Sequence, residues 1–145
     1  MSLMNFKIEA NSLGGMKTVV NARNFNIIVD EPKNLGGTDE GATPLELILA
    51  SLAGCYTVVG NFAARELGFE LKGMSTEIEG NMNPGRFAGR SFDERAGFQE
   101  INIRISPDAD TDRETLIKWL GMIESRCPVT DNLTNKTPLN ISLAR

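Results

Sequence analysis

The sequence contains no histidine. This absence excludes a Ser-His-Asp triad and a Cys-His catalytic pair, and it excludes most zinc enzymes. Cysteine is almost as scarce, because Cys55 and Cys127 are the only two in the chain. Two cysteines are too few for a disulfide scaffold, and their spacing is not that of a metal site. We therefore expect no metal and no cofactor, and acid–base chemistry would fall to carboxylates, lysines or the two thiols.

The sequence also lacks an excess of positive charge. Its 15 lysines and arginines stand against 19 aspartates and glutamates, which gives a net charge of −4. Such a chain offers no electrostatic surface for nucleic acid or an anionic membrane, so we expect neither as a partner. The N-terminal stretch has no basic flank followed by a long apolar core, which predicts a cytoplasmic location. Residues 1–3 precede a second methionine and are interpreted as an expression artefact.

The composition predicts a single globular domain over residues 1–145. Hydrophobic residues make up 41% and charged residues 23% of the chain, a balance typical of folded proteins. The length is sufficient for one domain with a sizeable core. Between residues 5 and 30, three segments with alternating or β-branched apolar residues predict three strands: "FKIEA", "KTVVNA" and "NFNIIVD". A loop with glycine and proline signals follows them.

A long central helix is predicted after that loop. Thr43, Pro44 and Glu46 form a capping box, with a hydroxyl cap, a proline in the first helical position and a carboxylate three residues after the cap. The helix is expected to run to about Leu67, with Gly68 as its C-cap. Its residues are apolar on nearly every side, and a helix without a polar face must be covered all round. One small sheet is not enough cover, which favours a second chain and hence a homodimer.

The second half of the chain predicts strands and then helices. Residues 69–82 predict one long strand or a strand pair, residues 83–97 a polar, glycine-rich loop, and residues 98–106 a further strand. A capping box of Thr111 and Glu114 then predicts an amphipathic helix. The apolar positions of this helix follow a helical spacing: Leu116, Ile117, Leu120 and Ile123.

Pro128 is predicted to end that helix. The segment "PVTDNLTN" predicts a second short helix, and "PLNISLA" predicts a final strand. The predicted order of elements is three strands, a long helix, two strands, two helices and a final strand. This order predicts an α+β fold with antiparallel strands.

Each cysteine has a structural and a chemical interpretation. Cys127 stands just before a helix start, where free backbone N–H groups and the adjacent Arg126 favour a thiolate. It could equally be a small buried residue at a helix junction. Cys55 lies inside an apolar helix, where burial raises the pKa of a thiol and packing is the simpler interpretation. As a pair without histidine, the two thiols suit a redox cycle in which one becomes a sulfenic acid and the other condenses with it to a disulfide.

Two motifs give a resemblance to a known family. "TPLELILASLAGC" followed by "RCPVTDNL" resembles the osmotically inducible protein C and organic hydroperoxide resistance (OsmC/Ohr) family, from about Ile27 to the C-terminus. The resemblance implies an OsmC/Ohr-like fold, in which antiparallel sheets wrap around central buried helices in an intertwined homodimer with active sites at the subunit interface. It also implies that Cys55 attacks the peroxide, that Cys127 resolves the product, and that external dithiols recycle the disulfide.

The glutamate of the family's peroxidases is displaced here. Those members pair the reactive thiol with a glutamate directly after the motif proline, whereas Leu45 occupies that position and the glutamate comes one residue later, at Glu46. Nine residues along a straight helix put Glu46 half a turn away from Cys55 and about 13 Å along the axis. A catalytic role for Glu46 therefore competes with its role in the capping box.

The family's peroxidases also use an arginine from the N-terminal strands. The corresponding segment here contains Lys17 and no arginine, and Arg23 would have to point inwards from its strand. Three arginines of the glycine-rich loop could substitute only if that loop folds over the site: Arg86, Arg90 and Arg95. Without a nearby cation, the first thiol lacks the charge that lowers its pKa.

Two functions from different classes are consistent with these residues. The first is a thiol-dependent peroxidase of organic or fatty acid hydroperoxides, with apolar walls around Cys55 formed by Leu49, Leu52, Val59 and Phe62. The second is a non-catalytic dimeric binding protein for a small apolar ligand or electrophile, which the displaced glutamate and the missing arginine favour.

Overall fold

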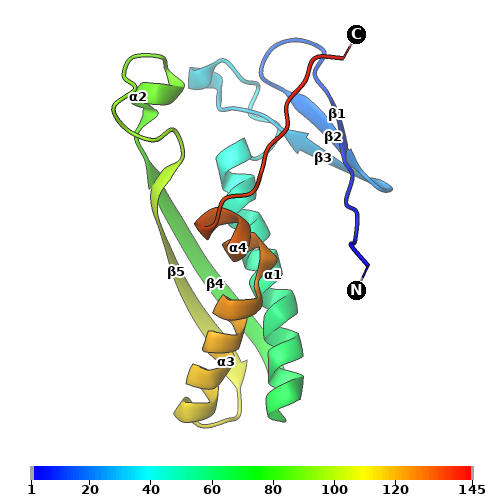
Figure 1. Cartoon of the computed structure of the whole chain (residues 1–145), viewed down its shortest axis with the longest axis vertical. Coiled ribbons are helices and arrows are strands. Elements are labelled where there is room, and N and C mark those ends of the chain that lie inside the picture. Colours follow the sequence, from blue (N-terminus) through cyan, green and yellow to red (C-terminus); the bar gives the residue numbers. More distant parts are fainter. Residues whose placement is uncertain (1, 145) are drawn as a thin grey trace. The chain divides into compact units, whose positions relative to one another are not determined.

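The computed structural model describes residues 2–144 and has an α+β architecture with two separate antiparallel sheets (Figure 1). The chain divides into two compact units, the first ending at Ile48 and the second beginning at Leu49. The predicted fold class, α+β with antiparallel strands, is confirmed.

The first unit carries a three-stranded antiparallel sheet in the order β1-β2-β3. Its strands are β1 (Glu9–Asn11), β2 (Thr18–Ala22) and β3 (Phe25–Val29). All three predicted strands are present, although the first begins at Glu9 and is shorter than expected. Arg23 occupies the tight turn between β2 and β3 with a positive φ of 58°, so it is a turn residue and not a strand residue.

A buried carboxylate organises the loop that leaves β3. Asp30 is 1% exposed and accepts hydrogen bonds from the N–H groups of Glu31, Thr38 and Glu40 and from the Thr38 hydroxyl. These donors span the whole loop, including the short 3₁₀ turn at Lys33–Leu35. Asp30 therefore ties both ends of the connection between the first sheet and the central helix.

The central helix, α1, spans Pro44–Leu67 as predicted. The capping box is present, because the Thr43 N–H donates to Glu46 Oε2 at 2.8 Å and the Glu46 N–H donates to Thr43 Oγ1 at 3.3 Å. Gly68 follows the last turn with a φ of 79°, the left-handed conformation of a helix C-cap. Among residues 2–144, α1 is the one helix long and apolar enough to cross a membrane, a test of length and composition that core helices of soluble proteins also pass.

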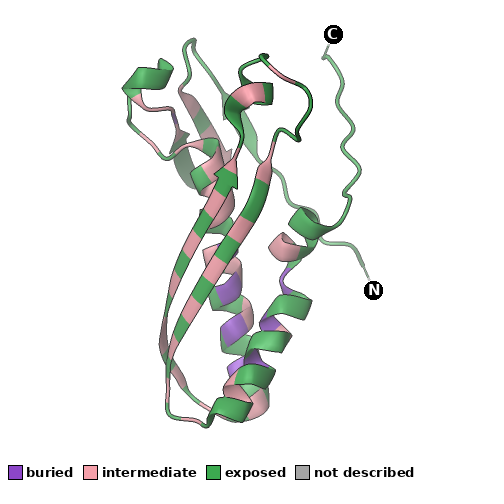
Figure 2. Ribbon diagram, turned by 90° about the vertical axis from the view of Figure 1, so that its left-hand side faces the viewer, coloured by how far each residue is buried: buried purple, intermediate pink, exposed green. Residues whose placement is uncertain are grey.

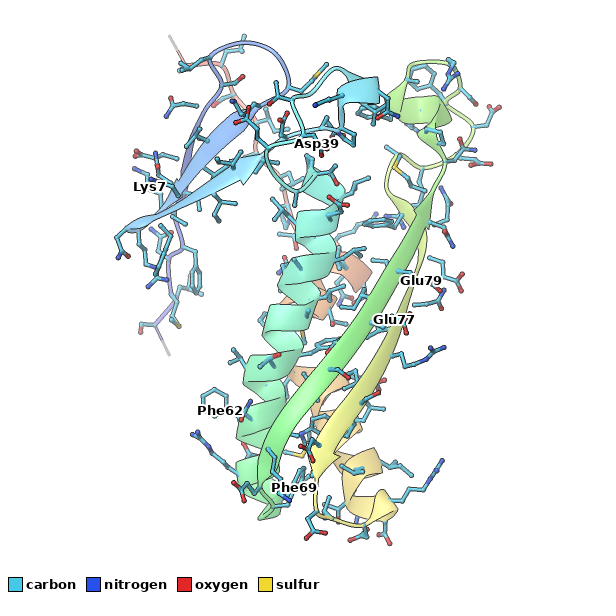
Figure 3. The ribbon with its side chains drawn as sticks, turned by 180° about the vertical axis from the view of Figure 1, so that it is seen from behind. Lys7, Asp39, Phe62, Phe69, Glu77 and Glu79 are labelled. Carbon is cyan, nitrogen blue, oxygen red and sulfur yellow. The ribbon has the colours of Figure 1, made fainter. Side chains whose placement is uncertain are left out.

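The second unit contains a long β-hairpin beside helices (Figure 1). Strand β4 (Leu71–Met82) pairs with β5 (Phe98–Ala109), so residues 69–82 contain one long strand and not a strand pair. The loop between the strands includes a short helix, α2 (Pro84–Phe87), which the sequence did not predict. The strands alternate, so that Ile78, Ile103 and their neighbours pack on the core, while Glu77 and Glu79 project from the outer face (Figure 3).

Helices α3 (Arg113–Arg126) and α4 (Pro128–Thr134) complete the second unit. Both were predicted, but the capping box of Thr111 and Glu114 was wrong. Asp112 is the N-cap of α3, and its carboxylate accepts a hydrogen bond from the Thr115 N–H at 2.9 Å. A carboxylate caps more effectively than a hydroxyl here because the helix dipole also attracts its charge.

The core lies where α1 meets α3 (Figure 2). The Trp119 indole N–H donates to the Gly60 carbonyl at 2.8 Å, and a Cβ added at Gly60 would come within 3.0 Å of the indole. Glycine at this position thus lets the two helices approach closely. Ile123 is buried as predicted, but Ile117 and Leu120 are exposed, because the face of α3 turned toward α1 is centred on Trp119 and Ile123.

The final strand predicted at "PLNISLA" was wrong. Residues 138–144 have no regular secondary structure, and their apolar side chains are almost fully exposed: Leu139, Ile141 and Leu143. A strand needs a neighbouring edge to satisfy its backbone hydrogen bonds, and among the described residues this segment pairs with none.

Candidate active site

The structure brings the two cysteines together. Cys55 lies in the middle of α1, and Cys127 lies at the junction of α3 and α4. Their sulfur atoms are 2.6 Å apart, and both cysteines are free thiols. The two sulfurs are therefore placed to share a proton or to be joined in a disulfide with little movement of the backbone.

Cys127 owes its position to Pro128. The proline ends α3 and starts α4, which makes Cys127 the N-cap of α4. Its sulfur accepts a hydrogen bond from the Thr130 N–H at 3.3 Å. Burial raises the pKa of this thiol, but hydrogen bonds from Cys55 and from Thr130 and Val129 outweigh burial, so that the pKa is lowered overall.

Arg126 contributes less to Cys127 than the sequence predicted. Its guanidinium binds both carboxylate oxygens of Glu66 on α1, at 2.8 and 2.9 Å. Because this arginine is committed to an ion pair, the lowered pKa of Cys127 rests on hydrogen bonds from Cys55, from the Thr130 side chain and from the N–H groups at the start of α4, and not on its cationic neighbour.

Cys55 has the opposite tendency. Burial raises the pKa of its thiol, and the contact with Cys127 raises it further. Either thiol can donate across the 2.6 Å contact, but the surroundings favour Cys55 as the donor and Cys127 as the thiolate, because the helix N–H groups point at Cys127. Cys55 is half-buried whereas Cys127 is 2% exposed, so Cys55 is the more exposed of the two residues.

Two further residues, which the sequence analysis missed, belong to this site. The Tyr56 hydroxyl lies 3.0 Å from Thr130 Oγ1, and Thr130 in turn contacts Cys127. Thr130 has a local signal, since it stands three residues after the N-cap and its N–H must point at the capping side chain. Tyr56 has no such signal, because its contact depends on how α1 packs against α4.

The charged residues of the first unit that were proposed for the site have partners within that unit. Glu46 makes both hydrogen bonds of the capping box at the start of α1. Lys17 forms an ion pair with Glu40 at 3.0 Å. The Arg23 guanidinium lies over the Phe25 ring, 5.1 Å from its centroid, within its own hairpin.

The arginines of the loop between β4 and β5 were the other predicted source of a cation that could lower the pKa of Cys55. Arg86 donates to the carbonyls of Phe92 and Glu94 and stacks on the Phe92 ring, so it stabilises its own loop. The influences on the Cys55 pKa come from burial, Cys127 and the Val129 N–H. Among residues 2–144 there is also no cluster of three or more His, Cys, Asp or Glu side chains that could hold a metal ion.

A groove of about 370 Å³ is lined by residues of α3 and β5 together with Tyr56, and neither cysteine is among its lining residues. Its walls are formed mainly by Ile103, Ile105, Leu116 and Leu120. The four residues predicted as apolar walls around Cys55, Leu49, Leu52, Val59 and Phe62, are not among those that line this groove. Leu52 is buried in the core, Val59 packs against the core, and Phe62 points away from the hairpin (Figure 3).

Comparison with known proteins identifies relatives of this chain. Residues 37–142 match the family described as OsmC-like protein. The uncharacterized protein YmaD of Bacillus subtilis (strain 168) is 25% identical over 142 residues, which cover 94% of this chain and 91% of YmaD.

Two crystal structures share the fold. The OsmC-like protein from Mycoplasma pneumoniae matches with a TM-score of 0.76 and 21% identity, over 90% of this chain and 88% of that one. The organic hydroperoxide resistance protein OhrB of Bacillus subtilis matches with a TM-score of 0.60 and 18% identity, over 90% of each chain. At these identities the likeness establishes the fold alone.

Proposed function

Because the chain belongs to the OsmC-like protein family, we propose that it is a thiol-dependent peroxidase that reduces organic or fatty acid hydroperoxides by a two-cysteine cycle. The observation that carries the proposal is the 2.6 Å contact between the Cys55 and Cys127 sulfurs. The fold shared with a protein named for organic hydroperoxide resistance supports a redox role of this kind.

The proposed cycle begins with a proton shared by the two sulfurs. Cys55 passes its proton to the Cys127 thiolate and attacks the terminal peroxide oxygen as a thiolate. The O–O bond breaks, Cys55 becomes a sulfenic acid, and the departing alkoxide takes the proton back from Cys127 to leave as an alcohol. In this step Cys55 loses two electrons and the peroxide gains them.

The second half of the cycle uses Cys127 again. Its regenerated thiolate attacks the sulfenic sulfur of Cys55, the S–O bond breaks, and hydroxide leaves as the disulfide forms. An external dithiol then reduces the disulfide and restores both thiols. The lower pKa of Cys127 suits both of its tasks, as proton acceptor for Cys55 and as resolving thiolate.

A groove that includes Tyr56, the neighbour of Cys55 in the chain, would suit an apolar hydroperoxide better than hydrogen peroxide, although neither cysteine lines it. The groove beside Tyr56 is lined mainly by aliphatic side chains, and its volume of about 370 Å³ is in the range of small-molecule sites.

We further propose that the active protein is a homodimer in the cytoplasm, and that its partners are the hydroperoxide and a dithiol reductant.

The experiment is dithiol-dependent consumption of cumene hydroperoxide, followed by mass spectrometry of the protein after one equivalent of peroxide. We expect wild type to turn over and to form the Cys55–Cys127 disulfide. Cys55→Ser should be inactive and form no disulfide, while Cys127→Ser should stall with Cys55 as a sulfenic or over-oxidised acid.

Two results would contradict the proposal. Equal turnover by wild type and Cys55→Ser would reject the mechanism, and over-oxidation of Cys127 alone in wild type would reverse the roles of the thiols. Ser51→Ala, on the same helix, is the matched control for a change of one small side chain on α1.

Two features of the site favour a second candidate function. Among the described residues, the groups that shift the Cys55 pKa include no cation. In addition, Leu45 occupies the position of the family's glutamate. Both features would suit a non-catalytic dimeric binding protein for a small apolar ligand or electrophile. Native mass spectrometry of freshly purified protein distinguishes the two, because only the binding protein should retain a ligand while showing no turnover.

A further inference from the structure

A chain of hydrogen bonds runs from α1 to the Cys127 sulfur. The Tyr56 hydroxyl and Thr130 Oγ1 are 3.0 Å apart. The Thr130 N–H donates to the Cys127 sulfur at 3.3 Å, and a hydrogen bond from the Thr130 side chain also lowers the pKa of the Cys127 thiol. On its other side the same sulfur meets Cys55 at 2.6 Å.

The direction of these bonds follows from what each group can do. A thiolate only accepts, so the Thr130 hydroxyl must give its hydrogen to Cys127 if it is to stabilise the charged form. The threonine oxygen can then accept a hydrogen from Tyr56, whose burial raises the pKa of its phenol and keeps it protonated. A donor that itself accepts a hydrogen bond is polarised and oriented by it, which strengthens its own bond.

The charged groups around these hydrogen bonds do not stabilise the Cys127 thiolate in their place. Cys55 and Tyr56 are the titratable groups that face it from α1, and Glu124 faces Tyr56 from α3. Glu124 and the two thiols act on Tyr56 with negative charge, which disfavours the phenolate. Arg126, the nearest cation in the sequence, is held by Glu66. Hydrogen bonding is therefore the means of stabilising a buried thiolate here.

We propose that Tyr56 and Thr130 are positioning residues that hold Cys127 as a thiolate through a relay from the Tyr56 hydroxyl, through the Thr130 hydroxyl, to the Cys127 sulfur. The relay concerns the second thiol of the proposed cycle. Loss of either hydroxyl leaves the backbone N–H bond of Thr130 in place but weakens the stabilisation of the thiolate. Cys127 would then be slower both to accept the proton of Cys55 and to attack its sulfenic acid.

The test measures the thiolate directly and needs no peroxide, so it remains decisive if the protein proves not to be a peroxidase. In a Cys55→Ser background Cys127 is the only thiol, and its ionisation can be followed by the ultraviolet absorbance of the thiolate across a pH series. Thr130→Val removes the hydroxyl at nearly constant shape, and Tyr56→Phe removes the first member of the relay.

We expect Thr130→Val to move the midpoint to higher pH, with about tenfold less thiolate at a pH below both midpoints, as for the loss of one hydrogen bond to a charged group. Tyr56→Phe should give a smaller shift in the same direction. Thr130→Ser, which retains the hydroxyl, should restore the wild-type midpoint. Thr57→Val is the matched control, because its hydroxyl bonds to the Ala53 carbonyl on α1 and takes no part in the relay.

An unchanged midpoint in Thr130→Val would overturn the proposal, and so would equal shifts in Thr130→Val and Thr130→Ser. If Thr130→Val does not fold, as judged by circular dichroism, Tyr56→Phe decides the matter: no shift in that variant means no relay. A midpoint that moves as far in Thr57→Val as in Tyr56→Phe would also overturn it, because the effect would then not depend on the relay hydroxyls.

Discussion

Asp30 is the clearest case in which one residue determines local structure. Its buried carboxylate accepts hydrogen bonds from three backbone N–H groups and one hydroxyl. The Thr38 hydroxyl bond leads the effects that lower the pKa of Asp30 from 3.8 to about 2, against the opposing effect of burial. A carboxylate satisfied in this way needs no cation, and its ionised form stabilises the loop before α1.

Replacing Asp30 by asparagine should destabilise the protein at neutral pH. The amide keeps one acceptor oxygen but turns an NH₂ group toward donors that needed an acceptor. Because the folded pKa of about 2 lies below the unfolded value of 3.8, the carboxylate contributes stability above pH 3.8 that is lost as the pH falls toward 2. The difference in thermal midpoint between wild type and Asp30→Asn should therefore shrink over that interval.

The matched control for that prediction is Asp108→Asn, an exposed carboxylate on β5. It should leave the thermal midpoint nearly unchanged at every pH. Parallel pH profiles for wild type and Asp30→Asn between 3.8 and about 2 would mean that the Asp30 charge does not stabilise the loop.

At the scale of elements, the parts of the fold that local signals determine were predictable. The capping box and the C-cap glycine fix both ends of α1, and alternation fixes β2, β3 and β5. The start of α3 was harder, because Thr111 and Asp112 are adjacent and both can cap a helix. The predicted cap fitted a pattern of residue types, whereas the true one also uses Thr115, whose hydroxyl donates to Asp112 Oδ2.

Local sequence patterns could not predict the contacts between elements. The approach of Cys55 to Cys127 was implied only by the family resemblance, since the residues lie on helices separated by the whole hairpin. The bond between Tyr56 and Thr130 depends on the packing of α1 against α4, and no pattern in either segment predicts it. The strand expected at residues 138–144 failed for the related reason that a strand is defined by its neighbour.

Alanine at the α3 cap tests this assignment. Asp112→Ala should lower the thermal midpoint by about 3 °C, since it removes the acceptor for the Thr115 N–H at the helix start. Thr111→Ala is the matched control and should change the midpoint by less than about 1 °C. A larger fall in the thermal midpoint for Thr111→Ala than for Asp112→Ala would show that Thr111 caps α3, as the sequence predicted.

At the scale of the whole molecule, the central helix is apolar along its length, yet only part of it is buried (Figure 2). Only 28% of the most apolar stretch of α1 is buried, and Val58 and Phe62 are 56% and 59% exposed. Ile117 on α3 is similarly exposed, and so are the alternating apolar residues of the C-terminal segment. Exposed apolar surface of this extent is typical of interfaces, which fits the proposed homodimer.

We therefore expect wild type to sediment as a dimer at micromolar concentration, with more than about 2,000 Å² buried in total, as in obligate pairs. Phe62→Glu should produce a monomer, because it would place an unpaired charge in the apolar interface. Ser106→Glu, on the outward face of β5, is the matched control and should remain dimeric. A monomeric wild type would contradict the dimer itself. A dimeric Phe62→Glu with wild-type helicity would instead show that this face of α1 lies outside the interface.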